Sequence, residues 1–343
     1  VMTIVAPYFW ANLAERFETK NNVLIAGVVL SALFVFSSLQ ATSVWILLIS
    51  MAIYAACWNA ILPQTETLTL ALTAQGKGDY SRIRLWGSMG YMALVVSVGY
   101  GVEWFGVWII QPVIMMFMAL LMIAVIRIPR VSNDHAGRAH REPLRQHFWQ
   151  RPVLIFMSAA VLVTVSHSPY YTFFDLYTRQ LGYSASASGW LVTLGVLAEI
   201  GLFMLANRII QRWRFAVILQ MALIVSAVRW VLLATLAESL WVLLIVQLFH
   251  AVSFGLMHSL AMHFVHNKFP DSQRGRAQGI YTALTYGVGG AIGNVLAGHL
   301  WQDGVGSSAT FMMSGMACVI AFSVVYTLWR RGDSAAPVEI QIK

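Results

Sequence analysis

The segment ALIVSAVRWVLLATL, residues 222–236, lies within the apolar run 215–236 and contains one charged side chain, Arg229. A run of roughly 17–25 apolar residues is long enough to cross a bilayer as a helix. A charge at the centre of such a helix costs about 2.5–3.5 kcal/mol on insertion scales and usually serves a function. The outer headgroups lie about 12 Å from Arg229 along the helix, farther than a snorkelling side chain fully covers. The segment therefore predicts a membrane-spanning helix whose arginine faces a polar interior.

The rest of the chain has the same apolar character. Of its 343 residues, 59% are hydrophobic and 10% are charged, whereas soluble domains carry about 25% charged residues. Nine further runs qualify as spans: 23–39, 44–65, 86–104, 107–128, 152–173, 185–206, 239–264, 279–300 and 308–329. Val1–Leu13 is a shorter apolar piece. No signal peptide is visible, and two cysteines in apolar runs make a disulfide framework unexpected. We predict an all-α membrane protein.

The basic residues are distributed asymmetrically. Twenty of the 22 Lys and Arg residues lie in alternate connections: 14–22, 74–85, 127–151, 207–214, 265–278 and the tail after Trp329. This is the positive-inside pattern, which places these connections and the C-terminus in the cytoplasm of a cell with a bacterial-type inner membrane. The net charge of +8 is explained by topology, and we expect no nucleic-acid partner.

An internal repeat organises the spans. DYSRIRLWG at 79–87 recurs as DSQRGRAQG at 271–279, and LAER at 13–16 recurs as LANR at 205–208, both at an offset of 192. We therefore expect two parallel helical bundles, 1–128 and 152–331, with a cytoplasmic linker at 129–151 and a cytoplasmic tail at 332–343. The offset places the partner of the 152–173 helix before residue 1. We accordingly expect twelve helices in two six-helix bundles, with the first helix and the start of the second missing from this chain.

Ionisable and polar residues inside the spans are the candidate site. With a helix rise of 1.5 Å per residue, His167 and Arg229 lie roughly 21–23 Å from the cytoplasmic ends of their helices. His250 reaches a comparable level, so Arg229 could meet both histidines. Glu199 and His258 lie lower, at roughly 10–12 Å, and could meet each other. On the 239–264 helix, the spacing of Gln247, His250 and His258 predicts one interior wall.

The first half offers another pair. Glu66 near the end of one helix and Arg84 at the start of the next are spaced so that their side chains could meet across the loop, although ordinary loop pairing explains this equally well. In the second half, Gly289 and Gly293 have the GxxxG spacing that permits close helix contact. His263 and His266 have an i, i+3 spacing seen in metal sites, but they end a helix near water, and we expect no metal or other cofactor.

The stretches ANLAERFETK, YSRIRLWGSMGY and YTRQLGYSASASGWLVTLGVLAEI resemble the major facilitator superfamily. RLWGS, GYSAS, AVRW and the His250/His258 helix resemble its 3-phenylpropionate permease branch. The resemblance implies two six-helix bundles around a central site, with alternating access. In the similar lactose-permease group, residues matching Glu66 and Arg84 hold the sugar and an aromatic residue stacks against it; here that aromatic is Tyr91 in place of Trp. Arg229 and His250 resemble that group's proton-coupling cluster.

The resemblance implies a secondary transporter, not an enzyme, that acts as a monomer driven by the proton gradient. We expect proton symport of a small organic solute, an aromatic or other carboxylic acid such as 3-phenylpropionate. The predicted solute-binding residues are Glu66, Arg84, Tyr91, His167, Arg229, Gln247 and His250. No acidic residue lies on the His250 helix, so Glu199 with His258, or else Asp175, would carry the proton. A sugar or nucleoside symporter, an intramembrane metal enzyme that uses His258, His263 and His266, and a non-transporting sensor stay open as alternatives.

Overall fold

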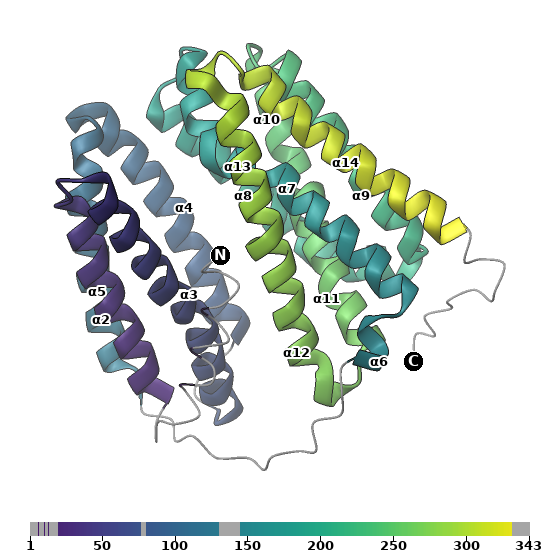
Figure 1. The fold of residues 1–343 in the computed structure, drawn as a ribbon, viewed down its shortest axis with the longest axis horizontal. Coiled ribbons are helices and arrows are strands. Elements are labelled where there is room, and N and C mark those ends of the chain that lie inside the picture. The colour runs from purple at the N-terminus through teal and green to yellow at the C-terminus, as the bar shows by residue number, and fades with distance from the viewer. Residues whose placement is uncertain are drawn as a thin grey trace. The chain divides into compact units, whose positions relative to one another are not determined.

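The computed structural model describes residues 20–76, 80–129 and 145–330, together with Ala6, Trp10 and Leu13. These residues form helices and short connections without any strand (Figure 1), which confirms the all-α prediction. Most of the predicted Val1–Leu13 piece, most of the predicted linker and the tail lie outside the described residues.

The first part of the chain folds into long helices: α2 (Lys20–Leu39), α3 (Val44–Ala74), α4 (Tyr80–Phe105), the 3₁₀ turn η1 (Val107–Ile109) and α5 (Ile110–Arg127). The second part is longer: α6 (Arg145–Phe148), α7 (Arg151–Gln180), α8 (Ala185–Arg212), α9 (Phe215–Thr235), α10 (Leu240–His250), η2 (Ala251–Leu256), α11 (Met257–Lys268), α12 (Asp271–Thr282), η3 (Ala283–Gly289), α13 (Gly290–Trp301), η4 (Gln302–Gly304) and α14 (Ser307–Arg330). The segments η2 and η3 are π-helical turns inside continuous helices.

Nine helices of the described residues are long and apolar enough to cross a membrane, and they coincide with nine of the ten predicted spans. The tenth, 279–300, is helical as part of the run α12–η3–α13. It is less apolar than the others because glycines, Thr285 and Asn294 interrupt its apolar residues.

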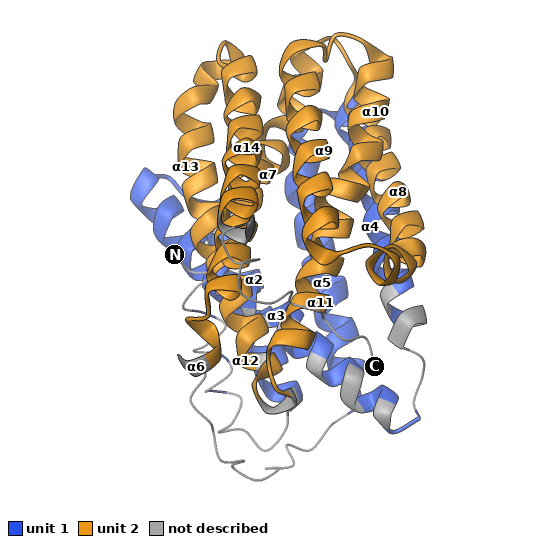
Figure 2. Cartoon of the chain, turned by 90° about the vertical axis from the view of Figure 1, so that its right-hand side faces the viewer, with its two compact units in different colours: residues 1–139 blue, residues 140–343 orange. Residues whose placement is uncertain are grey.

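The chain divides into two compact units, residues 1–139 and 140–343 (Figure 2). When the offset of 192 is applied to α2, α3, α4 and α5, the resulting ranges are 212–231, 236–266, 272–297 and 302–319. Each range overlaps a helix or helical run of the second unit, in the same order. The repeat seen in two loops of the sequence thus extends through four helices of each unit.

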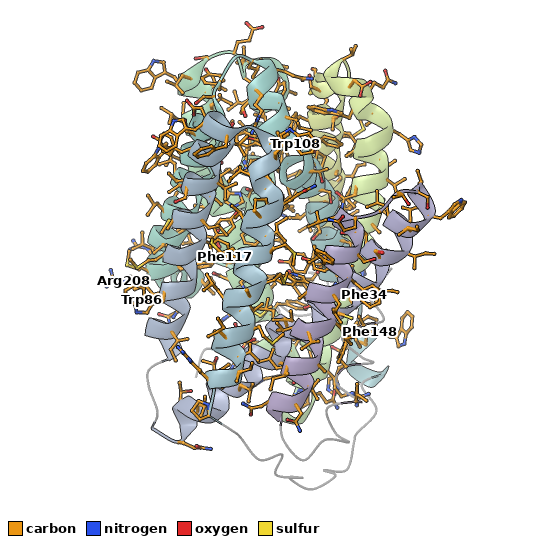
Figure 3. All side chains as sticks on the ribbon, turned by 90° about the vertical axis from the view of Figure 1, so that its left-hand side faces the viewer. Phe34, Trp86, Trp108, Phe117, Phe148 and Arg208 are labelled. Atoms are coloured by element: carbon orange, nitrogen blue, oxygen red, sulfur yellow. The ribbon has the colours of Figure 1, made fainter. Side chains whose placement is uncertain are left out.

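Large apolar side chains cover the outer surface of each unit, as expected for a lipid-facing surface. In the first unit, Trp86 and Trp108 are 70% and 76% exposed, and Figure 3 shows them near opposite ends of the helices, with Phe117 between them. Tryptophan concentrates at the two membrane–water interfaces. The two residues therefore mark the borders of the membrane-spanning part of this unit.

The interior of the second unit has three layers. One apolar cluster contains Phe156, Leu219 and Leu260, and another contains Phe174, Leu233 and Leu243. Between these positions, α7, α9 and the α10–η2 run each contribute buried polar residues: Ser166, His167 and Ser168; Ser226 and Arg229; Gln247, His250 and Ser253. The polar layer holds the candidate site.

Candidate functional site

The second unit contains a cavity of about 220 Å³. Three helical runs line it: α7, the run from η2 to α11, and the run from α12 to α13. The lining residues are Ala160, Val163, Thr164, His167, Ser168, Tyr171, Thr172, Ser253, Phe254, Met257, His258, Tyr281, Tyr286, Gly290 and Asn294. Aromatic rings, hydroxyl groups and one amide dominate this wall, and its ionisable groups are histidines and tyrosines. Such a surface suits a small solute with an aromatic ring and a few polar groups.

Arg229 lies directly behind this wall, in the polar layer. Its side chain is fully buried, with 0% exposed. Nε donates a hydrogen bond to the Val246 carbonyl at 2.9 Å, and Nη1 donates to Ser253 Oγ at 2.9 Å. The guanidinium also lies over the rings of Tyr170 and Trp230, 4.6 and 4.2 Å from their centroids. These contacts hold the cation in place without neutralising it.

The charge of Arg229 has no counter-ion among the described residues. No carboxylate lies within 4.0 Å of the guanidinium, and its buried Nη2 has no hydrogen-bond partner there. An uncompensated charge in a low-dielectric interior is costly and strongly attracts an anion. Ser253 both accepts a hydrogen bond from Arg229 and forms part of the cavity wall, so at this point only the thickness of one side chain separates the positive charge from the cavity.

His167 connects the same arginine to the cavity. Its Nδ1 lies 2.8 Å from the Val163 carbonyl, which can only accept, so the ring carries its proton on Nδ1. The lone pair of Nε2 then faces Ser253 Oγ at 3.3 Å and Arg229 Nη1 at 3.5 Å. The predicted meeting of Arg229 with His167 is therefore present, with the imidazole in its neutral form.

The carboxylate of Glu199 contacts a histidine of the same layer. Glu199 Oε2 lies 3.8 Å from His250 Nε2, while His250 stacks on the Tyr170 ring with centroids 5.5 Å apart. Two glycines allow α8 to approach so closely: a Cβ on Gly255 would lie 2.9 Å from Glu199 Cγ, and one on Gly195 would lie 3.1 Å from Gln247 Oε1. The rings of His250 and Tyr170 therefore lie in contact between Glu199 and Arg229.

The predicted wall of Gln247, His250 and His258 divides into two parts. His258 lines the cavity, but Gln247 and His250 do not; Gln247 accepts a hydrogen bond from Tyr170 Oη at 2.8 Å and is fully buried. The π-helical turn η2 lies between His250 and His258. It widens the helix locally and changes its rotation, so an eleven-residue spacing no longer returns to the same face.

Asp175 lies away from this cluster. Its carboxylate pairs with Arg179 Nε at 2.9 Å one turn along α7, and its side chain is 53% exposed. It does not line the cavity. The geometry thus connects Glu199, rather than Asp175, to the polar layer.

Of the first unit's candidates, Glu66 is half-buried on α3 and Tyr91 is 49% exposed on α4. The side chain of Arg84 lies outside the described part of the structure, so its pairing with Glu66 stays a prediction.

Sequence reasoning missed several residues of the site: Tyr170, Tyr171, Trp230, Ser253, Phe254 and Asn294. A usable signal existed for two of them. Tyr170 follows His167 by three residues and Ser253 follows His250 by three, so each lies on the same helix face as a histidine already identified.

A metal site finds no support in the described residues, since no three His, Cys, Asp or Glu side chains there gather around a common point. His263 Nε2 instead lies 2.9 Å from Asn267 Nδ2.

Comparison with known proteins gives a consistent result. The MFS_1 like family matches residues 1–313. The probable 3-phenylpropionic acid transporter of Escherichia coli (strain K12) is 28% identical over 310 residues, covering 85% of this chain and 80% of that protein. The maltose permease of Geobacillus stearothermophilus is 26% identical over 342 residues, covering 98% and 84%. The crystal structure of the nucleoside transporter NupG superposes with a TM-score of 0.81 at 15% identity, covering 96% and 87%.

Proposed function

We propose, from the premise that this chain belongs to the MFS_1 like family of the major facilitator superfamily, that it is a proton-coupled symporter of an aromatic or other small carboxylic acid. As a member of that family it is a multi-pass membrane transporter of small molecules and not an enzyme. Its solute and its coupling ion are the subject of the proposal, with 3-phenylpropionate as the first candidate.

The uncompensated charge of Arg229 is the observation that carries the proposal. A fully buried guanidinium with no carboxylate partner among the described residues has a large desolvation cost, which a neutral solute would not offset. An anionic solute that entered the cavity beside Ser253 and His167 would supply the missing charge. The carboxylate would accept a hydrogen bond from the Ser253 hydroxyl, while Arg229 stabilises it from behind the wall.

The aromatic lining supports an aromatic acid over an aliphatic one. Phe254 and Tyr171 meet edge to face, with centroids 6.3 Å apart, and both line the cavity. An engineered apolar cavity of about 150 Å³ takes up benzene, so 220 Å³ accommodates a phenyl ring with a short chain. The similarity to the probable 3-phenylpropionic acid transporter of Escherichia coli supports the same solute class.

Proton coupling would depend on Glu199. Among the described residues, its carboxylate is the one found in contact with the polar layer, 3.8 Å from His250. Burial disfavours the charged form of a carboxyl group, so this side chain is suited to binding and releasing a proton during the transport cycle. His258, on the cavity wall, is the second candidate for that step.

The protein would act as a monomer in the cytoplasmic membrane of a bacterial-type cell, with its C-terminus in the cytoplasm, as the distribution of Lys and Arg favours. Glu66, Arg84 and Tyr91 are further proposed solute contacts, as the resemblance to the lactose-permease group implies. Alternating access would expose the site to each side in turn.

A sugar or nucleoside symporter is the second candidate. The maltose permease relative covers more of this chain than the phenylpropionate relative does, and hydroxyl groups of Ser168 and Thr172 line the cavity. This alternative gives the charge of Arg229 no partner, and we rank it second for that reason.

The decisive experiment measures external pH in a weakly buffered suspension of cells that express the gene, after addition of 3-phenylpropionate, maltose or uridine. We expect alkalinisation with the acid alone and none in a Glu199→Gln variant. Alkalinisation with maltose or uridine would establish the alternative instead. Uptake of labelled 3-phenylpropionate without a pH change would identify a facilitator and refute the role of Glu199.

A further inference from the structure

The outer end of the cavity carries a polar pair that the proposed carboxylate site does not use. Thr172 on α7 donates its hydroxyl hydrogen to Asn294 Oδ1 on α13 at 2.9 Å. This contact occupies the amide oxygen and orients the amide. It leaves the two N–H bonds of Nδ2 as donors and the oxygen of Thr172 as an acceptor.

The position of Asn294 follows from a close helix contact. The two runs α7 and α13 pack side by side (Figure 2). A Cβ on Gly293 would lie 2.7 Å from the Val165 carbonyl oxygen and clash with Ser168. That carbonyl lacks its helical hydrogen bond because Pro169 has no N–H. The glycine of the GxxxG pair therefore brings α13 against the backbone of α7 and seats Asn294 opposite Thr172.

The spacing of the two polar regions matches a short aromatic acid. Thr172 follows His167 by five residues, which is roughly 7.5 Å along α7. His167 and Ser253 form the wall in front of Arg229, and the aromatic residues Tyr171 and Phe254 line the same cavity. An arylpropionate with its carboxylate at the Ser253 hydroxyl, beside His167, and its ring beside Tyr171 would place the far edge of that ring near Thr172 and Asn294.

We propose that Thr172 and Asn294 form a subsite for a hydroxyl group on the solute's ring, and that the preferred solutes are hydroxylated aromatic acids such as 3-(4-hydroxyphenyl)propionate. A phenolic hydroxyl both donates and accepts. It would donate to Thr172 Oγ1 and accept from Asn294 Nδ2, which satisfies both groups at once. An unsubstituted ring would remove water from them without replacing its hydrogen bonds. This inference rests on the proposed function, because it assumes that the carboxylate lies near His167.

The test compares labelled 3-(4-hydroxyphenyl)propionate with labelled 3-phenylpropionate in proteoliposomes that contain the full chain. The readout is the ratio of the two kcat/KM values, which does not depend on how much active protein is reconstituted. The variants are Thr172→Val and Asn294→Leu. Thr235→Val is the matched control, because its hydroxyl bonds only its own helix, at the Val231 carbonyl, on the exposed side of α9.

We expect the unaltered protein and Thr235→Val to prefer the hydroxylated acid about tenfold, the size of one net hydrogen bond. The ratio should fall to about one in Thr172→Val and in Asn294→Leu. Equal transport of both acids by the unaltered protein, or an unchanged ratio in both variants, would overturn the subsite and leave the proposed function standing. Transport of neither acid would overturn the proposed function and the subsite with it.

Discussion

Replacement of Arg229 by methionine tests the electrostatic argument most directly. Methionine keeps much of the side chain's length and removes the charge. Replacing a buried ion with an apolar side chain of similar volume is often neutral or stabilising, so the variant should fold. We expect it to retain the cavity and to lose most of its affinity for an anionic solute.

The magnitude can be worked from the contacts at the cavity wall. Arg229 Nη1 lies 2.9 Å from Ser253 Oγ, and a carboxylate bonded to that hydroxyl would lie one further hydrogen-bond length away, at most about 5.6 Å from the cation. At an effective dielectric constant of about 20, two unit charges at that separation attract each other by about 3 kcal/mol. Loss of this attraction corresponds to a fall in kcat/KM on the order of a hundredfold.

The assay is uptake of labelled 3-phenylpropionate into proteoliposomes, with 3-phenylpropionamide as the uncharged analogue of equal shape. We expect Arg229→Met to lower kcat/KM for the acid about a hundredfold and for the amide less than threefold. Arg208→Met is the matched control, since it removes the same charge from an exposed position on α8. Equal losses for acid and amide would show that Arg229 acts on the fold alone. An unchanged rate with the acid would refute its role entirely.

Two further substitutions test how the site is built. Gly255→Ala would place a methyl group 2.9 Å from Glu199 Cγ, which should destabilise the fold by about 1–3 kcal/mol. We expect this variant to have a lower melting temperature and a smaller solute-induced pH change, whereas Gly201→Ala, with nothing within 4 Å of the added Cβ, should leave both unchanged. Equal effects of the two substitutions would contradict the inference that Gly255 is needed for the close approach of α8. Ser253→Ala removes the hydroxyl that accepts a hydrogen bond from Arg229, and the donor left unsatisfied on Arg229 costs about 1–3 kcal/mol. In the same uptake assay, the KM for the acid should rise by a factor of about ten or more. An unaltered KM would show that the carboxylate lies elsewhere.

Much of the site's composition could be predicted from the sequence, because the height of a residue along its helix axis follows from its position in the chain. The heights of His167 and Arg229 followed from counting residues, and the two side chains do meet, at 3.5 Å. The rotation of each helix could not be predicted in the same way. Glu199 reaches His250 because the glycine at 255 lets α8 approach, and a π-helical turn separates the face of His250 from that of His258.

The sequence by itself determined the spans and the repeat, because hydropathy and an offset of 192 can be read directly from the chain. The positions of Lys and Arg predict the orientation of those spans. The sequence also determined that a charge would be buried at Arg229. Only the tertiary structure decided that this charge lacks a carboxylate partner among the described residues, that Ser253 lies between Arg229 and the cavity, and that Thr172 faces Asn294. These depend on which faces of α7, α9, α10 and α13 touch, and that is set by side-chain packing between segments far apart in the chain.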